Sequence, residues 1–326
     1  MVLFVHNRYR TTGGEERAVA DLLWLVREHL GEPAELLARD SAQVGRAHAA
    51  LGLLSGGLEP REVAGAVRLS GARVLHAHNL QPTLGWRALA AARAAGARVV
   101  VHLHQYRLVC AVGVCYTHGA ECTRCHARNT LPGVRLNCRG NLGEALTYGA
   151  ALALWQRRLV AQADAVIVPS AFARERLREL GAPLPWRRVH VLAPPLRSAF
   201  GGGSAPDGGA PPRAADAGAA DAGPSAATDA SGRQYALVVS RLSAEKGVDV
   251  AIDACRMADM PLVIAGEGPE RTALRERAGE GAVRFLGRVD DAELARLRAG
   301  AALALVPSRS GESFGLAAAE AMAAGV

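Results

Sequence analysis

The sequence predicts an α/β protein with two domains, each built on a parallel sheet that helices cover on both faces. Three observations predict this fold. Short runs rich in Val and Leu alternate with helical patterns, as expected of strands buried on both faces. The length of 326 residues exceeds the roughly 250–300 that a single core usually holds. A stretch of Gly, Ala, Pro, Asp, Ser and Thr at 201–232 divides the chain.

The first domain is expected over residues 1–200. Its six expected strands are the apolar runs at 2–6, 34–38, 73–78, 97–104, 164–169 and 188–193. The clearest helical patterns lie at 15–30, 84–95, 142–160 and 171–180. Strands that alternate with helices in this way favour a parallel sheet, because each crossover helix returns the chain to the same edge.

Residues 201–232 show no periodicity and few large apolar side chains. Such a segment cannot bury enough surface to offset its ordering entropy, so we expect a disordered linker. The second domain is expected over 233–326, with strands at 235–240, 261–265, 283–286 and 302–306 and helices at 248–255, 270–278, 291–299 and 316–324. The sequence stops where a further strand would begin, so this domain is expected to be truncated.

Composition narrows the classes of protein. Only 4% of residues are aromatic, so the cores must be aliphatic. No apolar run reaches the roughly 20 residues of a membrane span, and the N-terminus lacks the basic start and cleavage site of a signal peptide. A cytoplasmic location with reduced thiols is therefore expected. The formal net charge of +7 suits anionic partners such as nucleotides, phospholipid head groups or nucleic acid, with compositional drift towards Arg as the alternative.

Two basic residues of the second domain indicate an anion site. Arg241 and Lys246 lie in the loop between a strand and a helix, and Lys246 is the only lysine in the sequence. A departing diphosphate needs its charges neutralised. Arginine offers a planar fork of donors to phosphate oxygens, whereas lysine offers a compact charge. The two residues together suit a diphosphate.

Two glutamates accompany this basic pair. Glu312 precedes a helix that Phe314, Gly315 and Leu316 open with N–H groups able to bind an anion. Glu320 lies in an apolar stripe of that helix, where a carboxylate without partners would be costly. The alternative is that Glu312 and Glu320 are ordinary charged residues of a helix without a ligand. With the basic pair, the carboxylates predict a site for a sugar joined to a diphosphate.

The motifs of the second domain resemble the donor-binding half of glycosyltransferase family 4. They are Ser-Arg-Leu-Ser-Ala-Glu-Lys-Gly at 240–247, Ile-Ala-Gly-Glu-Gly-Pro at 264–269, Phe-Leu-Gly-Arg-Val at 285–289 and Glu-Ser-Phe-Gly-Leu at 312–316. The resemblance implies two facing Rossmann-like domains of the GT-B type. It also implies transfer from a nucleotide-diphospho-sugar with retention of anomeric configuration and without a catalytic metal, and the sequence contains no Asp-x-Asp triplet.

The resemblance also implies roles for individual residues. Arg241 and Lys246 would hold the donor diphosphate, Glu312 the transferred sugar and Glu320 the ribose. The remaining donor-binding residues would be Gly13, Gly14, Gly266, Gly268, Gly287, Ser313, Phe314, Gly315 and Leu316. Family members usually continue past Val326, so a fragment that binds donor without turnover is the alternative.

Histidines gather at the ends of two expected strands. His76 and His78 alternate along one strand and His102 and His104 along another, which places each pair on one face. Open α/β sheets bind ligands at the carboxyl ends of their strands. By resemblance, His104 is the histidine near the transferred sugar and a catalytic candidate. A structural role is the alternative, and His78 is a weaker candidate.

Five cysteines lie between residues 110 and 138, in an insert at about 110–140 without periodicity. Cys122 and Cys125 have the spacing of a metal knuckle, and four thiolates suit tetrahedral zinc. The predicted structural zinc ligands are Cys110, Cys122, Cys125 and Cys138, with Cys115, His118 or His126 as substitutes. Free thiols are the alternative. A subset of the resembled family carries a similar insert.

The resemblance therefore implies a retaining hexosyltransferase, with a glycan, a lipid-linked molecule or a small molecule as the acceptor. The helix at 142–160 carries Trp155, Arg157 and Arg158 and could contact a membrane surface, with a packed connector helix as the alternative. The alternative hypothesis is a zinc-dependent nucleic-acid-binding protein. That hypothesis does not explain the residues of the predicted donor site, so no nucleic acid partner is expected.

Overall fold

The computed structural model describes residues 1–9, 13–197 and 235–326. The chain divides into two compact units. The first comprises Met1–Pro195 with Glu312–Phe314, and the second comprises Leu196–Gly311 with Gly315–Val326. The predicted linker at 201–232 lies outside the described residues. Both units are α/β, in agreement with the predicted fold class, whereas the predicted domain bounds stay a prediction.

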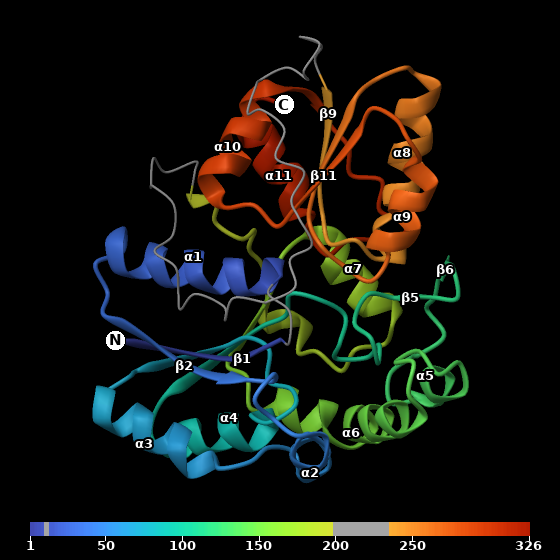
Figure 1. The fold of residues 1–326 in the computed structure, drawn as a ribbon. Helices are drawn as coiled ribbons and strands as arrows, with labels where there is room; N and C mark the ends of the chain where they lie inside the picture. The colour runs from blue at the N-terminus through green and yellow to red at the C-terminus, as the bar shows by residue number, and fades with distance from the viewer. Residues whose placement is uncertain (10–12, 198–234) are drawn as a thin grey trace. The chain divides into compact units, whose positions relative to one another are not determined.

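Six parallel strands form the sheet of the first unit, within its described residues, in the order β2-β1-β3-β4-β7-β8 (Figure 1). The strands are β1 Val2–Arg8, β2 Ala34–Asp40, β3 Val74–Ala77, β4 Arg98–His102, β7 Ala165–Val168 and β8 Val189–Val191. All six predicted strands are confirmed. Four predicted carboxyl ends were too long by one or two residues, those of β3, β4, β7 and β8, so His78 and His104 lie in the loops that leave the sheet.

Helices cover both faces of this sheet, α1 on one and α3 and α4 on the other (Figure 1). Alternate residues of β1 divide between the two faces: Val5 packs with Val63 of α3, whereas Phe4 packs with Leu22 of α1. The helices are α1 Gly14–Glu28, α2 Arg46–Ser55, α3 Pro60–Ser70, α4 Gly85–Ala94, α6 Leu142–Ala161 and α7 Ala171–Glu179, with a 3₁₀ turn η1 at Trp186–Arg188. The sequence analysis did not resolve α2 and α3.

The cysteine-rich insert follows β4 and contains little regular structure. A hairpin of β5 Tyr116–Thr117 and β6 Ala120–Glu121 is followed by the short helix α5 Leu131–Arg135. Such short elements bury little apolar surface, so the insert depends on other contacts for its order.

The second unit contains a four-stranded parallel sheet in the order β11-β10-β9-β12, counted over the residues described there. Its elements are β9 Tyr235–Val239, η3 Ala244–Lys246, α8 Val248–Met257, β10 Leu262–Ala265, α9 Arg271–Ala278, β11 Val283–Gly287, α10 Asp291–Gly300, β12 Ala301–Ala304 and α11 Leu316–Ala323. Val238 of β9 packs with Ile252 of α8, whereas Leu237 packs with Leu294 of α10. The predicted order of strands and helices is confirmed.

Each sheet reverses its strand order at one point. In the first unit β1 lies between β2 and β3, and in the second β9 lies between β10 and β12. Open α/β sheets bind ligands at the carboxyl ends of strands beside such a reversal. The loops after β1 and β3, and those after β9 and β12, are therefore the places where a site is expected. None of the helices in the described ranges has the length and hydropathy of a membrane span.

Candidate functional site

The loop after β9 carries Arg241 and Lys246, and the segment after β12 fixes it. The Arg309 backbone N–H donates to the carbonyl of Glu245 (2.8 Å), and the Arg309 guanidinium pairs with Asp249 at the start of α8 (2.6 Å). The hydrogen bond from Arg309 lowers the pKa of Asp249. The predicted diphosphate-binding pair thus stands at the strand-order reversal of the second unit. The sequence analysis did not find Arg309 or Asp249.

Glycines allow the loops after β9 and β10 to pack backbone against backbone. A Cβ atom on Gly266 would lie 1.8 Å from the carbonyl oxygen of Ser240, and one on Gly268 would lie 2.1 Å from that of Leu242. Gly266 also donates its N–H to the carbonyl of Gly287 (2.7 Å). The three predicted glycines therefore join three loops at one edge of the sheet. Their contact with the sugar-nucleotide donor stays a prediction.

Glu320 of α11 is buried with Arg298 of α10. Each residue is 8% exposed, and the Arg298 guanidinium donates to the Glu320 carboxylate. A buried carboxylate needs such a partner. The sequence indicated that Glu320 needs a partner, but no pattern identified Arg298. The predicted contact of Glu320 with a ribose remains untested.

The segment Glu312–Phe314 belongs to the first unit by its contacts. The Ser313 hydroxyl donates to the backbone carbonyl of His104 (2.5 Å), and the Ser170 hydroxyl donates to the carbonyl of Ser313 (2.6 Å). The predicted helix comes next in the chain: α11 begins at Leu316, directly after Gly315. The structure thus places Ser313 against the predicted catalytic histidine.

Four histidines form a stacked row at the ends of β3 and β4. His78 and His104 share a hydrogen bond between Nδ1 and Nε2 (2.7 Å), and the rings of His102 and His104 stack at 4.2 Å. Burial, with repulsion from neighbouring histidines, lowers the pKa of His76 to about 4 and those of His78 and His102 well below their usual range. Burial also lowers the pKa of His104. The row is therefore neutral at pH 7.

Three of these histidines also have ligand atoms within 4.8 Å of one another, and His76, His78 and His102 form the only such group in the described portion of the chain. The ring planes of His76 and His102 differ by 12°, and those of His76 and His78 by 26°. The lone pair of an imidazole nitrogen lies in the ring plane, so stacked rings direct their lone pairs side by side. This arrangement favours a neutral stack over a metal centre.

A polar cluster surrounds the start of α1 in the first unit. The Glu15 carboxylate accepts from the Tyr9 hydroxyl (2.8 Å) and from Gln105 Nε2 (3.0 Å), and the Arg107 guanidinium lies 4.9 Å from the centre of the Tyr9 ring. These side chains line a cavity together with His104. The sequence analysis missed Tyr9 and Glu15 because no spacing rule links them to the residues after β4.

Gly13 and Gly14, two of the predicted donor-binding residues, lie beside this cluster. Helix α1 begins at Gly14 as expected, and the Glu16 carboxylate accepts from the backbone N–H groups of Gly13 (2.8 Å) and Tyr9 (3.0 Å). Burial raises the pKa of Glu16, but hydrogen bonds from His6 and these N–H groups outweigh burial and lower it. Glu16 therefore closes the loop in its charged form. Donor contact by Gly13 and Gly14 stays a prediction.

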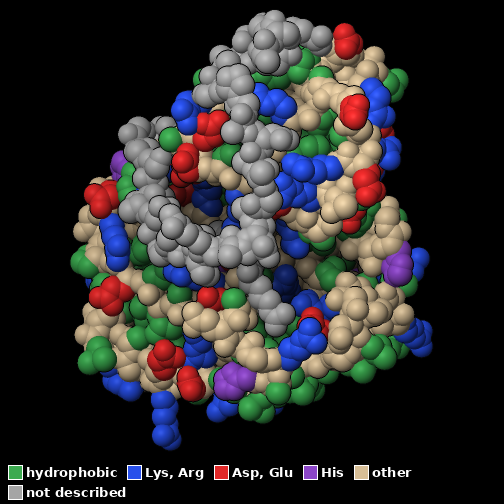
Figure 2. Space-filling model, in the orientation of Figure 1, with side chains coloured by type: hydrophobic (Ala, Val, Ile, Leu, Met, Phe, Trp, Pro, Cys, Tyr) green, Lys and Arg blue, Asp and Glu red, His purple; other side chains and the backbone are tan. Residues whose placement is uncertain are grey.

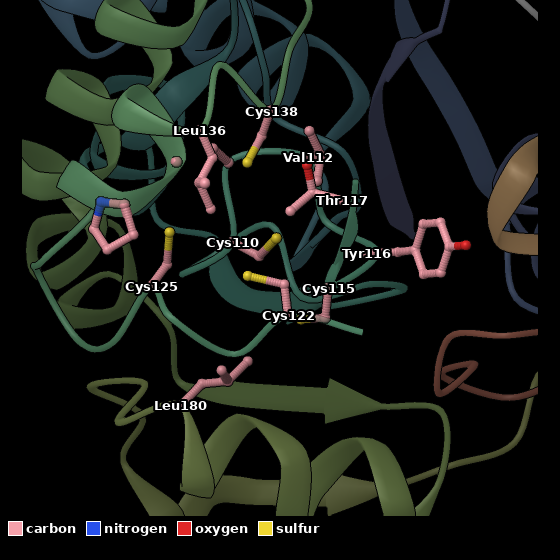
Figure 3. Close-up of a pocket in the computed structure, with 13 residues that line it drawn as sticks. Cys110, Val112, Cys115, Tyr116, Thr117, Cys122, Cys125, Leu136, Cys138 and Leu180 are labelled. Atoms are coloured by element: carbon pink, nitrogen blue, oxygen red, sulfur yellow. The ribbon is translucent and has the colours of Figure 1, made fainter. Parts of the chain in front are cut away.

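The cysteines of the insert surround a second, smaller cavity. Cys110, Cys115, Cys122, Cys125 and Cys138 all line it, and Figure 3 shows the sulfur atoms of Cys110, Cys122, Cys125 and Cys138 directed into the same space. All five are free thiols. The four predicted ligands therefore lie around one cavity, together with the first of the named substitutes.

The two histidines named as substitute ligands have other contacts. His118 Nε2 lies 2.9 Å from the carbonyl oxygen of Leu136, and the His126 ring lies beside Gly181. Within the cavity the Cys115 thiol donates to Cys110, which lowers the pKa of Cys110 to about 6.

Charged side chains of both signs are interspersed on the face drawn in Figure 2.

Two family profiles match the chain. Residues 2–195 match the family described as glycosyl transferase 4-like domain, and residues 225–326 match glycosyl transferases group 1. Among solved structures, Anabaena HepE (Alr3699) in complex with UDP superimposes with a TM-score of 0.54 at 17% identity, covering 99% of this chain and 78% of that chain. Its complex with UDP-glucose gives the same TM-score at 18% identity. The fold is the GT-B glycosyltransferase fold.

Curated relatives match over shorter segments. A segment of 72 residues is 47% identical to the phosphatidyl-myo-inositol mannosyltransferase of Mycolicibacterium smegmatis, covering 22% of this chain and 18% of the relative. A segment of 91 residues is 44% identical to the GDP-mannose-dependent alpha-(1-6)-phosphatidylinositol dimannoside mannosyltransferase of Mycobacterium tuberculosis, covering 26% of this chain and 24% of the relative. The chain thus matches about a fifth to a quarter of these relatives' length.

Proposed function

Because the chain belongs to the glycosyl transferase 4-like family, we propose that it transfers a mannosyl residue from GDP-mannose to a hydroxyl group of an acceptor, with retention of anomeric configuration. The observation that carries this proposal is the position of Arg241 and Lys246 beside the strand-order reversal of the second unit. The choice of donor is supported by the segment that is 44% identical to a GDP-mannose-dependent enzyme.

Electrostatic stabilisation of the leaving group is the main contribution of the second unit. Arg241 and Lys246 bind the diphosphate as negative charge develops on it. Arg309 holds their loop through the carbonyl of Glu245, so the cations do not have to be ordered during the reaction. The N–H groups at the start of α11 add a further positive potential.

The transfer exchanges one bond at the anomeric carbon for another. The acceptor oxygen bonds to that carbon while the bond from the carbon to the diphosphate oxygen breaks. The electron pair of the broken bond leaves with GDP, and the departing phosphate oxygen takes the acceptor proton. Glu312 accepts hydrogen bonds from the sugar, and Glu320 from the ribose. A catalytic divalent metal has no step in this scheme.

His104 orients the reacting groups as a neutral imidazole. Its Nε2 is engaged by His78 and its backbone carbonyl by Ser313. A neutral ring contacts sugar hydroxyls without introducing a cation that would compete with the developing positive charge on the sugar. The lowered pKa of His104 supports this role.

A structural zinc ion in the cysteine insert is a separate part of the proposal. Cys110, Cys122, Cys125 and Cys138 would supply four thiolates, and the Cys115 thiol would donate a hydrogen bond to Cys110. When bound, zinc would crosslink an insert that has little regular structure of its own. The free thiols around one cavity support this assignment.

A thermal-shift comparison of sugar nucleotides tests the donor site. GDP-mannose should raise the melting temperature of the parent protein more than UDP-glucose or ADP-glucose does. The Lys246→Ala variant should lose most of this rise. Arg296→Ala is the matched control, because Arg296 is an exposed cation on α10 of the same unit. An equal rise in the parent and in Lys246→Ala would refute the donor site.

A further inference from the structure

The loop that leaves β4 carries both the predicted catalytic histidine and the first cysteine of the insert. His104 stands near its start, and Cys110 follows a short way along the chain. Backbone hydrogen bonds close this loop: the Tyr106 N–H donates to the carbonyl of Gly113 (3.0 Å), and the Cys110 N–H donates to the carbonyl of Tyr106 (2.9 Å). The backbone around the thiols is therefore bonded directly to the backbone that follows His104.

Gly113 brings the insert against the side chain of Gln105. Its φ of +84° lies in the left-handed region, and a Cβ atom added there would lie 2.1 Å from Gln105 Oε1 and 3.3 Å from Arg107 Nε. Glycine alone allows this approach, because a side chain would strain the backbone and displace Gln105. The start of the insert thus packs against two side chains of the loop after β4.

Gln105 connects this contact to the polar cluster at the start of α1. Its Nε2 donates to the Tyr9 hydroxyl and to the Glu15 carboxylate (3.0 Å). Gln105 is the neighbour of His104 in the chain, and both line the same cavity as Tyr9 and Glu15. The Gln105 amide is therefore held by Gly113 on one side and by the polar cluster on the other.

The thiols lie on both sides of this contact, because Gly113 stands between Cys110 and Cys115 in the chain. Both cysteines are buried in the main core of the first unit. The cavity that the thiols surround measures about 10 Å³, which is roughly the space of one water molecule. It suits a single ion and excludes an organic molecule. An ion bound by Cys110 would fix one end of the segment that carries Gly113.

We propose that the cysteine insert positions His104 and Gln105 for the transfer reaction, and that a zinc ion held by the cysteines fixes this position. Gly113 and Gln105 are the positioning residues, because they make the contact between the insert and the loop. The reaction itself rests on the proposed function. Since a misplacement of about 1 Å can cost roughly 100-fold in rate, a small movement of Gly113 suffices.

Amide hydrogen exchange tests the effect of the ion without turnover. The reduced full chain is compared with zinc bound and after a chelator has removed the metal. Peptides from 103–113 should exchange at least about tenfold more slowly with zinc, because the N–H groups of Tyr106 and Cys110 are bonded within that loop. Peptides from α8 are the internal control and should not change. Equal exchange of 103–113 in both samples, or no zinc bound by the reduced chain, would overturn the role of the ion.

Two glycine variants test the contact with Gln105. Gly113→Ala places a methyl group against Gln105, whereas Gly119→Ala adds the same group at a similar φ of +79° with no atom within 4 Å. Because both glycines lie in the insert, the comparison separates the contact from backbone strain. Gly113→Ala should lower kcat by about 10–100-fold with unchanged KM for GDP-mannose, and Gly119→Ala should match the parent. Equal kcat in the two variants would refute the contact.

A double variant shows whether Gly113 acts through Gln105. Gln105→Ser removes the amide that the new methyl group would displace. The double variant Gly113→Ala, Gln105→Ser should therefore lose no more kcat than Gln105→Ser alone. Losses that multiply in the double variant would show that Gly113 acts elsewhere.

Zinc content and circular dichroism are measured on the same samples, and both should match the parent in Gly113→Ala and Gly119→Ala. If no variant and no parent sample transfers mannose while zinc slows exchange at 103–113, the proposed function is wrong and the link between ion and loop holds. If the parent transfers mannose and Gly113→Ala is as active as Gly119→Ala, the function holds and the positioning role is refuted. If Gly113→Ala does not fold, the exchange experiment on the parent still decides whether the ion fixes the loop.

Discussion

His78 Nδ1 and His104 Nε2 lie 2.7 Å apart, so one ring donates a proton to the hydrogen bond and the other accepts it. The two residues are 26 positions apart in the chain and meet because β3 and β4 are neighbours in the sheet. Both pKa values are lowered by burial, so both rings are neutral at pH 7. The orientation and tautomer of His104 therefore depend on His78.

Removing His78 should impair turnover through His104. His104→Ala is expected to lower kcat of mannosyl transfer by about 100-fold, because it removes a side chain that orients the reacting groups. His78→Leu should lower kcat by a smaller factor, with little change in KM for GDP-mannose, because it frees the ring of His104 without removing it. His78→Asn retains a polar partner and should recover part of the loss. The exposed His48→Leu serves as control, and equal kcat in His78→Leu and His48→Leu would contradict the role of His78.

The histidine row should make stability depend on pH in a defined window. The unfolded chain takes up a proton at His76 near pH 6.5, whereas the folded chain does so only near pH 4. The free energy of unfolding should therefore be highest above pH 6.5 and fall by about 1–3 kcal/mol towards pH 4 on account of His76. Urea titrations of His76→Leu should show a shallower fall. The exposed His190→Leu should follow the parent, and identical slopes in all three would contradict the prediction.

The buried pair of Arg298 and Glu320 should couple strongly. Arg298→Met leaves a carboxylate buried without its partner and should cost about 3–5 kcal/mol of unfolding free energy in urea titrations. The double variant Arg298→Met, Glu320→Leu should be less destabilised than that single variant. Arg296→Met, which removes an exposed partner of Glu293, should cost under about 1 kcal/mol. If the losses of unfolding free energy in Arg298→Met and in Glu320→Leu, each measured alone, sum to the loss in the double variant, the two side chains are not coupled.

Zinc in the cysteine insert should be measurable without any activity assay. Elemental analysis of the purified protein should find about one zinc per chain, since a four-thiolate site holds one ion. Cys122→Ser and Cys125→Ser should each lose most of that zinc and lower the melting temperature. Cys255→Ser is the control, because Cys255 packs in the core of the second unit and not at the insert. Zinc well below one equivalent in the parent would end the assignment.

Much of the fold could be predicted because it follows from local patterns. The ten strands of the two parallel sheets were found from apolar runs, and helix α11 was found from small residues after Gly315. Helices α2 and α3 were not resolved, although Pro60 at the first position of α3 and the buried spacing of Val63 and Val67 were available signals. The loop positions of Arg241 and Lys246 followed from the same patterns, whereas their ligand remains a prediction.

The sequence by itself determined which segments become strands and helices and which residue types carry the chemistry. A strand or helix that buries one face needs apolar residues at a regular spacing, and that spacing can be read from the sequence. The tertiary structure alone decided which distant side chains meet. Arg298 meets Glu320, Trp86 meets Trp155, and His78 meets His104. These pairs depend on the order of the strands and on the packing of the helices. Side chains that meet in this way have no characteristic separation in the sequence, so no sequence pattern predicts them.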